Sequence, residues 1–188
     1  KDGKFSTGHW GELARLINDH SFGANWVHHF LKSSEVKNEY EGRKLVELIN
    51  NNNVEIQGNH CFIESFINFW VIAKSLFYLI KIRLRLGGLP RVKALDQTKS
   101  WIVPLVETSI LESLSGRVAA QNLVWFFCFE RVLKKLPTQK MGLYLYESQG
   151  WERALVFLWK VFGHGPLVGV AHSSIRYWDL RYFEPSDS

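Results

Sequence analysis

Cysteine is scarce in this sequence, with two residues among 188. Cys61 and Cys128 lie far apart in apolar stretches, without a CxxC pair or a Cys/His pattern around them. This spacing argues against a disulfide framework and against a zinc site. We therefore expect two free, buried thiols and no bound metal.

The sequence also lacks the loops and motifs that identify several enzyme classes. It has neither a P-loop nor a GxGxxG sequence for phosphates. No GxSxG motif surrounds Ser173, so we do not expect a hydrolase triad. His28 and His29 are adjacent rather than four residues apart, which favours half-buried structural histidines over a helical metal pair. Cations and aromatics do not alternate as in a nucleic-acid-binding module, so no nucleic-acid partner is expected.

Long uninterrupted apolar runs are absent too. A membrane-spanning helix needs about 20 predominantly apolar residues, but the longest apolar region, residues 61–90, contains Glu64, Lys74 and Lys81. We expect one long helix there, ended by its Gly-Gly and Pro residues. Its basic last turns leave two interpretations open: a core helix with a solvated basic end, or a helix that rests on an anionic membrane surface.

Hydrophobic residues, by contrast, are plentiful. They make up 46% of the chain, and aromatic residues make up 14%. This composition predicts one folded domain over residues 1–188 with a substantial core. The net charge of +5 favours an anionic partner such as a nucleotide, a phosphate or an acidic lipid surface. Because the chain begins at Lys1 without a Met or a signal-like region, we expect a piece of a longer protein.

The spacing of apolar residues predicts several elements before residue 136. A helical turn is the alternative to the first strand, and a helix-rich insertion is expected at about 60–136, bent near Ser115 and Gly116. The predicted elements are a helix within 9–20, a strand within 24–31, a helix within 41–53 and a short strand at 54–57.

The last third predicts a β-α-β unit at about 141–174. A helix within 150–165 separates two strands that are almost continuously apolar, as in parallel strands covered on both faces. Glu147 and His172 follow these strands at their carboxyl ends, where ligands bind to open parallel sheets. A carboxylate and an imidazole there can share acid and base work. The alternative is that Glu147 caps the helix and His172 satisfies loop backbone groups.

At these residues a family resemblance enters. The run "YLYESQGWERALVFLWKVFGHGPLVGVAHSSIRYWDLRYF", with "HWGEL", "NWVHHFL" and "SLSGRVAAQNLVWFFCF" upstream, resembles the blocks of a family of bacterial surface carbohydrate biosynthesis proteins encoded in O-antigen and capsule clusters. Such proteins are similar to GT-B glycosyltransferases, in which two Rossmann-like domains face each other. The resemblance implies an α/β fold: a helix-rich Rossmann-like domain with a short parallel sheet, as the N-terminal half of a GT-B-like architecture.

The resemblance also implies roles for residues near the end of the chain. Glycosyl transfer needs a base for the acceptor hydroxyl and cations for the departing diphosphate. Glu147 and His172 are the predicted catalytic residues. For each arginine of the site the alternative is a surface ion pair. The predicted substrate-binding residues are Ser173, Arg176, Trp178, Asp179, Arg181, Tyr182 and His164.

The implied function is that of the acceptor-side domain of a cytoplasmic transferase in peripheral contact with an anionic membrane. It would bind a glycan or lipid-linked acceptor, while a missing C-terminal domain would bind the nucleotide-sugar donor. We therefore expect no cofactor in this chain and no turnover by it alone. The alternative is a non-catalytic domain that holds a glycan or lipid-linked acceptor for a polysaccharide assembly system.

Overall fold

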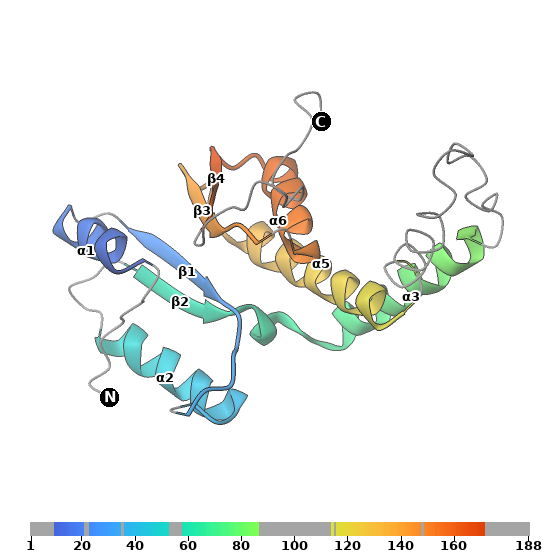
Figure 1. The fold of residues 1–188 in the computed structure, drawn as a ribbon, viewed down its shortest axis with the longest axis horizontal. Coiled ribbons are helices and arrows are strands. Elements are labelled where there is room, and N and C mark those ends of the chain that lie inside the picture. The colour runs from blue at the N-terminus through green and yellow to red at the C-terminus, as the bar shows by residue number, and fades with distance from the viewer. Residues whose placement is uncertain are drawn as a thin grey trace, which may run out of the picture. The chain divides into compact units, whose positions relative to one another are not determined.

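The computed structural model describes residues 10–20, 23–34, 36–52, 58–86, 114, 116–147 and 149–171. These residues form an α/β chain with short parallel sheets, which confirms the expected class (Figure 1). The chain divides into two compact units, Lys1–Phe66 and Ile67–Ser188, called unit 1 and unit 2 below.

Unit 1 is built on two parallel strands joined by a helix. β1 and β2 pair in a register that sets Trp26 opposite His60, and α2 packs against β2. The predicted helices near residues 9–20 and 41–53 and the predicted strand near 24–31 are confirmed. The elements of unit 1 are α1 (Gly11–Asp19), β1 (Ala24–His28), α2 (Glu39–Asn52), β2 (Gly58–Phe62) and the 3-10 helix η1 (Ile63–Phe66).

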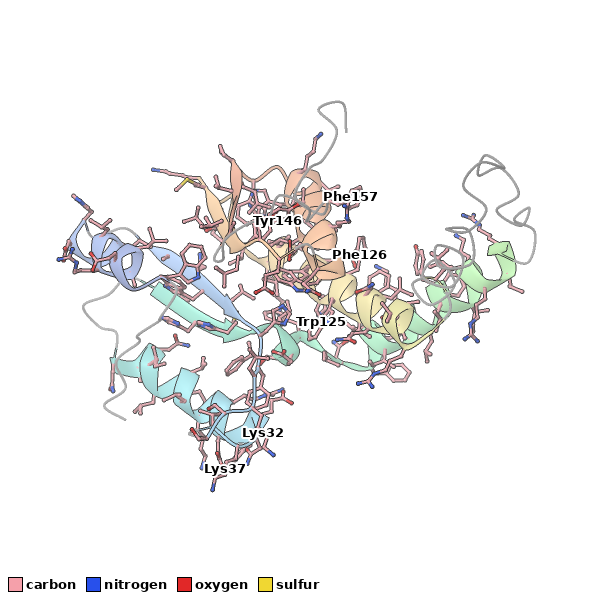
Figure 2. All side chains as sticks on the ribbon, viewed as in Figure 1. Lys32, Lys37, Trp125, Phe126, Tyr146 and Phe157 are labelled. Atoms are coloured by element: carbon pink, nitrogen blue, oxygen red, sulfur yellow. The ribbon has the colours of Figure 1, made fainter. Side chains whose placement is uncertain are left out.

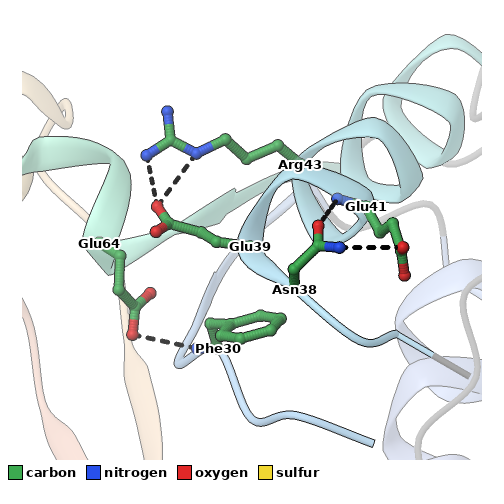
Figure 3. Close-up of polar contacts among 6 residues, drawn as sticks. All are labelled: Phe30, Asn38, Glu39, Glu41, Arg43 and Glu64. Atoms are coloured by element: carbon green, nitrogen blue, oxygen red, sulfur yellow. Dashed lines mark hydrogen bonds and ion pairs between the residues drawn. The ribbon is translucent and has the colours of Figure 1, made fainter. Parts of the chain in front are cut away.

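Helix α2 begins where Asn38 caps it (Figure 3). The Asn38 Oδ1 accepts the backbone N–H of Glu41 at 2.9 Å, and the Asn38 amide donates to the Glu41 carboxylate at 2.9 Å. This reciprocal pairing satisfies donors that the first helical turn leaves open. One turn on, Gly42 is buried so close to the rings of Phe30 and Phe62 that a Cβ would lie 3.2 Å from each. A small residue therefore lets α2 approach the strands.

The single long helix expected over residues 61–90 is wrong in its first part. Cys61 and Phe62 belong to β2, and the 3-10 helix follows directly. The helix α3 starts only at Phe69 and ends at Leu86, and the Asn68 Oδ1 accepts the Val71 N–H at 2.9 Å at its start. Where a short apolar strand is followed directly by an apolar helix, the spacing of apolar residues shows no clear change. The sequence pattern therefore could not separate β2 from α3.

Some predicted features cannot be compared with the structure. The short strand at 54–57 and the Gly-Gly and Pro residues after α3 lie outside the described residues, as does Ser115. Gly116 is described, and it caps the start of α5 with an extended backbone.

Among the described residues of unit 2, three helices pack beside a second pair of parallel strands. α5 supplies much of its core, with buried residues that include Phe127, Cys128 and Leu133. Both cysteines are free, as predicted, although Cys61 is only half-buried. The elements of unit 2 are α3 (Phe69–Leu86), α5 (Arg117–Lys135), β3 (Gly142–Leu145), α6 (Gly150–Val161) and β4 (Leu167–Val170).

Helix α5 lies between α3 and α6 and packs against both. It runs antiparallel to α3, because the Lys74 Nζ contacts the Glu130 Oε2 at 2.7 Å while the Tyr78 ring lies 5.4 Å from that of Phe127. The predicted helix-rich insertion therefore holds α3 and α5, but its predicted start near residue 60 falls inside β2.

The predicted β-α-β unit is confirmed as β3, α6 and β4, with parallel strands. The expectation that both strand faces are covered is wrong at three positions, one of which is Gly169. Leu143 and Val168, which pair across the strands, are both exposed. Among the helices in the described part of the chain, none combines the length and the apolar character needed to cross a membrane.

The loop from β3 to α6 is held by a buried carboxylate. Glu152 is 2% exposed, and its Oε1 accepts the backbone N–H groups of Glu147 at 3.0 Å and Gln149 at 2.9 Å. Together with the Gln149 side chain this forms a capping box. Glu152, rather than Glu147, is thus the carboxylate that caps the helix.

We expect Glu152→Ala to lower the free energy of unfolding by about 1–3 kcal/mol, because two part-buried backbone N–H groups lose their acceptor. Urea denaturation followed by circular dichroism measures the change. Lys160→Ala, an exposed site on the same helix, is the control. Equal stability of the two variants would contradict the anchoring role of Glu152.

Candidate functional site

Glu147 lies at the carboxyl end of β3, as predicted. It is half-buried, and it follows Tyr146, whose N–H donates to the Val170 carbonyl at 3.0 Å. The carboxyl ends of β3 and β4 therefore lie side by side. The position of Glu147 suits a group that faces a ligand beyond the strands.

Most partners predicted for Glu147 lie outside the described residues. Their assignments as a base, as phosphate-binding cations or as stacking aromatics stay predictions. These residues are His172, Ser173, Arg176, Trp178, Asp179, Arg181 and Tyr182.

His164, predicted to bind substrate, lies at the other end of the strand pair from Glu147. It precedes β4, its Nδ1 accepts the Gln139 backbone N–H at 3.1 Å, and its ring lies 4.6 Å from that of Trp159. The length of β3, about 13 Å for its four residues, separates it from the edge that carries Glu147. The structure thus does not bring His164 and Glu147 together, and His164 fastens the segment before β3.

A second pair of parallel strands carries an imidazole and a carboxylate at one edge. His29 follows β1 and Glu64 follows β2, and the His29 Nδ1 lies 3.6 Å from the Glu64 Oε1. The same Glu64 oxygen accepts the backbone N–H of Phe30 at 3.0 Å (Figure 3). The sequence predicts the same kind of arrangement for Glu147 and His172 in unit 2, where His172 lies outside the described residues.

The environment of Glu64 keeps its carboxyl group ionised. Burial opposes ionisation, but the nearby His29 ring and hydrogen bonds from backbone N–H groups, including that of Phe30, outweigh it and lower the pKa of Glu64. Its second oxygen, Oε2, is buried and has no hydrogen-bond partner among the described residues. A buried acceptor without a donor is costly, so this oxygen is suited to receive a hydrogen bond from a ligand hydroxyl.

The His29–Glu64 pair can perform general base chemistry. A carboxylate beside an imidazole orients the ring and stabilises its protonated form, so the imidazole can take a proton from a hydroxyl. The side chain of His29 is half-buried, and its Nε2 is shielded from solvent. A substrate therefore reaches Nε2 only if the atoms that cover it move.

A histidine pair lies next to this edge, inside the strand pair. The His28 Nε2 is 3.0 Å from the His60 Nδ1, and their rings stack at 5.3 Å. The Trp26 ring also lies parallel to the His60 ring, with the ring centres 6.0 Å apart. The Asn50 side-chain amide donates to the backbone carbonyl of His60 and accepts the backbone N–H of His60. His28 is thus a half-buried structural histidine, as expected.

Both members of this pair are neutral near pH 7. Burial lowers the pKa of His28, and burial together with the charge of His28 lowers the pKa of His60 to about 4. A neutral imidazole has one donor and one acceptor nitrogen, so the short contact is a single hydrogen bond between the rings. Protonation of both rings would leave two donors facing each other.

Unit 2 contains a hollow of about 300 Å³ between α3, α5 and α6. Phe126 and Phe157, labelled in Figure 2, form part of its apolar wall, and their rings lie 6.1 Å apart. Asn122 and Arg153 are its polar lining residues, so it lacks the groups for acid–base work. Within the described ranges no three His, Cys, Asp or Glu side chains gather to hold a metal ion.

Comparison of the chain with family models, with curated proteins and with solved structures finds no match. The site must therefore be argued from its geometry. Sequence reasoning missed the His29–Glu64 pair because Glu64 was assigned to a long helix. The signal that could have found it is the order strand, helix, strand from residue 24 onward, which favours a parallel pair with polar residues after both strands.

The lowered pKa of His60 predicts acid-sensitive stability. As pH falls below the ordinary histidine pKa of 6.5, the unfolded chain binds a proton at His60, while the folded chain stays neutral there until about pH 4. The free energy of unfolding should therefore fall across this window, by at most about 3 kcal/mol from this residue.

Urea denaturation from pH 4 to 8 measures this dependence. His60→Asn, which places an amide near the Nδ1 position without a titrating ring, should flatten the slope between pH 6.5 and 4. His20→Asn, at an exposed histidine of the same unit, is the matched control. An unchanged slope in His60→Asn would refute the assignment.

Proposed function

We propose that this chain is the acceptor-side domain of a glycosyltransferase-like enzyme of bacterial surface polysaccharide biosynthesis. Its fold is a helix-rich Rossmann-like domain, the N-terminal half of a GT-B-like architecture. The reaction transfers a sugar from a nucleotide-sugar donor to a hydroxyl of a glycan or lipid-linked acceptor. The resemblance of the sequence blocks supports the family, and the geometry of unit 1 supports the chemistry.

The observation that carries the proposal is the His29–Glu64 pair at the carboxyl ends of two parallel strands. Transfer to a hydroxyl requires removal of its proton as the new bond forms. His29 is assigned as the base, and Glu64 as the carboxylate that orients it and accepts a hydrogen bond from the acceptor. Both groups come from the edge at which open parallel sheets bind ligands.

Glu147 is the second candidate base. It stands at the equivalent edge of β3 and β4, where the predicted partner is His172. The two assignments are independent, because each rests on its own strand pair. The family resemblance assigns the donor nucleotide to a separate C-terminal domain, and the sequence contains no glycine-rich phosphate loop.

The test uses the natural protein that contains this sequence, assayed with a panel of nucleotide sugars and lipid-linked or glycan acceptors. His29→Gln and Glu64→Gln should each lower kcat about 100-fold or more, the usual effect of losing a general base or its partner. The KM for the donor should change little, because neither residue is assigned to the donor.

Control variants remove a comparable group at exposed positions of unit 1. His20→Gln and Glu39→Gln should keep full activity. Full transfer by both His29→Gln and Glu64→Gln would overturn the assignment of this pair. If Glu147→Gln and His172→Gln abolish transfer instead, the base belongs to the edge of β3 and β4.

The same assay separates the enzyme from a binding domain. Acceptor binding without transfer from any donor in the panel would favour the non-catalytic function. In that case neither the unaltered protein nor His29→Gln should show turnover. His29→Gln should nevertheless weaken acceptor binding, which calorimetry measures.

A further inference from the structure

Helix α3 has one buried face and one exposed face. At about 100° per residue, Val71, Ser75 and Ile82 lie on one side of the helix. Val71 and Ser75 are buried, the Ser75 Oγ donates to the Val71 carbonyl at 2.7 Å, and Ile82 lines the hollow that α3 shares with α5. This side is the one that packs in unit 2.

The opposite side of α3 is apolar and exposed. Six large side chains share an arc of about 120° there, and each is between 53% and 77% exposed. We call this set the α3 apolar face. Its members are Phe69, Trp70, Leu76, Phe77, Ile80 and Leu84. Isolated exposed apolar residues are ordinary, but a contiguous stripe of this size marks a binding surface.

Basic residues flank the α3 apolar face. Lys81 and Arg85 lie along one flank and Arg83 along the other, all in the second half of the helix. The helix contains no Asp or Glu. Lys74, further back on the first flank, pairs with Glu130 and lies over the Phe127 ring at 4.5 Å, so it belongs to the packing with α5.

The described residues of unit 2 are strongly cationic as a group. They contain eleven Lys or Arg residues against three Glu. Two of those carboxylates already have partners: Glu130 forms an ion pair with Lys74, and Glu152 caps α6. The surface around the apolar face therefore carries a positive potential that suits an anionic partner.

These observations favour one kind of binding partner for the α3 apolar face. An apolar stripe rich in aromatics, bordered by Lys and Arg on a helix about 27 Å long, has the form of a helix that lies in the plane of a membrane interface. Nucleic acid would use the cations but leave six apolar side chains in water. A protein partner would not require cations on both flanks of the stripe.

We propose that the α3 apolar face inserts into the interfacial layer of an anionic membrane, with Lys81, Arg83 and Arg85 at the level of the lipid phosphates. Unit 2 is thereby held on the surface through one helix, while the buried side of α3 keeps its packing with α5. This inference does not depend on the transferase proposal, because it uses no residue of either candidate base.

Co-sedimentation of the full chain with lipid vesicles tests the proposal. The protein should bind vesicles that mix phosphatidylcholine with phosphatidylglycerol, and bind vesicles of phosphatidylcholine alone at least tenfold more weakly. The double variant Phe77→Gln/Leu84→Gln should lose at least tenfold in partitioning to the anionic vesicles. Its matched control is Leu45→Gln/Leu48→Gln, which changes two exposed leucines of α2 and should bind as the unaltered chain does.

A second pair of variants tests the charges. Lys81→Ala/Arg85→Ala should weaken binding on the order of fivefold per cation removed, and added salt should reduce that difference. Lys32→Ala/Lys37→Ala, which removes the same charge from the segment before α2 (Figure 2), should have a smaller effect. Circular dichroism of every variant establishes that the fold is kept.

Three results would overturn the proposal. One is equal binding to neutral and anionic vesicles, and another is full binding by Phe77→Gln/Leu84→Gln. The third is the absence of vesicle binding by the unaltered chain. In that last case sedimentation velocity tests a different occupant: a dimer that Phe77→Gln/Leu84→Gln dissociates assigns the face to a second copy of the chain.

Discussion

The parallel pairing of short strands is the constraint on which the rest of the structure depends. Two parallel strands cannot be joined by a tight turn, so a helix must connect β1 to β2 and β3 to β4. The connection returns the chain to the same end of the pair, and both strands then finish at one edge. Residues separated by more than thirty positions, such as His29 and Glu64, become neighbours there for this reason alone.

The two strand pairs use their polar groups differently. In unit 1 His60 is 4% exposed, and burial keeps both His60 and His28 uncharged. Glu64, beside His29, stays ionised. In unit 2 the buried carboxylate is Glu152, which serves the backbone at the start of α6. Glu147 is thereby left at the edge of the strands with its side chain outside the cap. One type of residue thus caps a helix at one position and lies at the edge of the strands at another.

Much of the fold was predictable, and each error has a physical cause. α1, α2 and α6 show a clear helical period, and the strands around α6 are bounded by glycine and polar residues, so local pattern was sufficient. β2 was missed because "CFI" continues without a break toward the apolar helix α3. Glu64 was therefore assigned to the interior of a helix, and the His29–Glu64 pair of unit 1 was not predicted. The turn that holds His164 was predicted between the helix and the second strand, as the structure has it, but the sequence pattern did not show that this turn lies at the other end of the strand pair from Glu147.

The sequence by itself determined the α/β character, the parallel β-α-β unit, the free thiols and the basic charge, because each follows from residue spacing or composition within a short stretch. Tertiary structure alone decided which polar groups meet, how far burial shifts the pKa of His60, and which face of α3 remains in solvent. These are properties of contacts between distant segments. An apolar helix can bury either side, and only its packing against α5 left the stripe from Phe69 to Leu84 exposed between flanking cations.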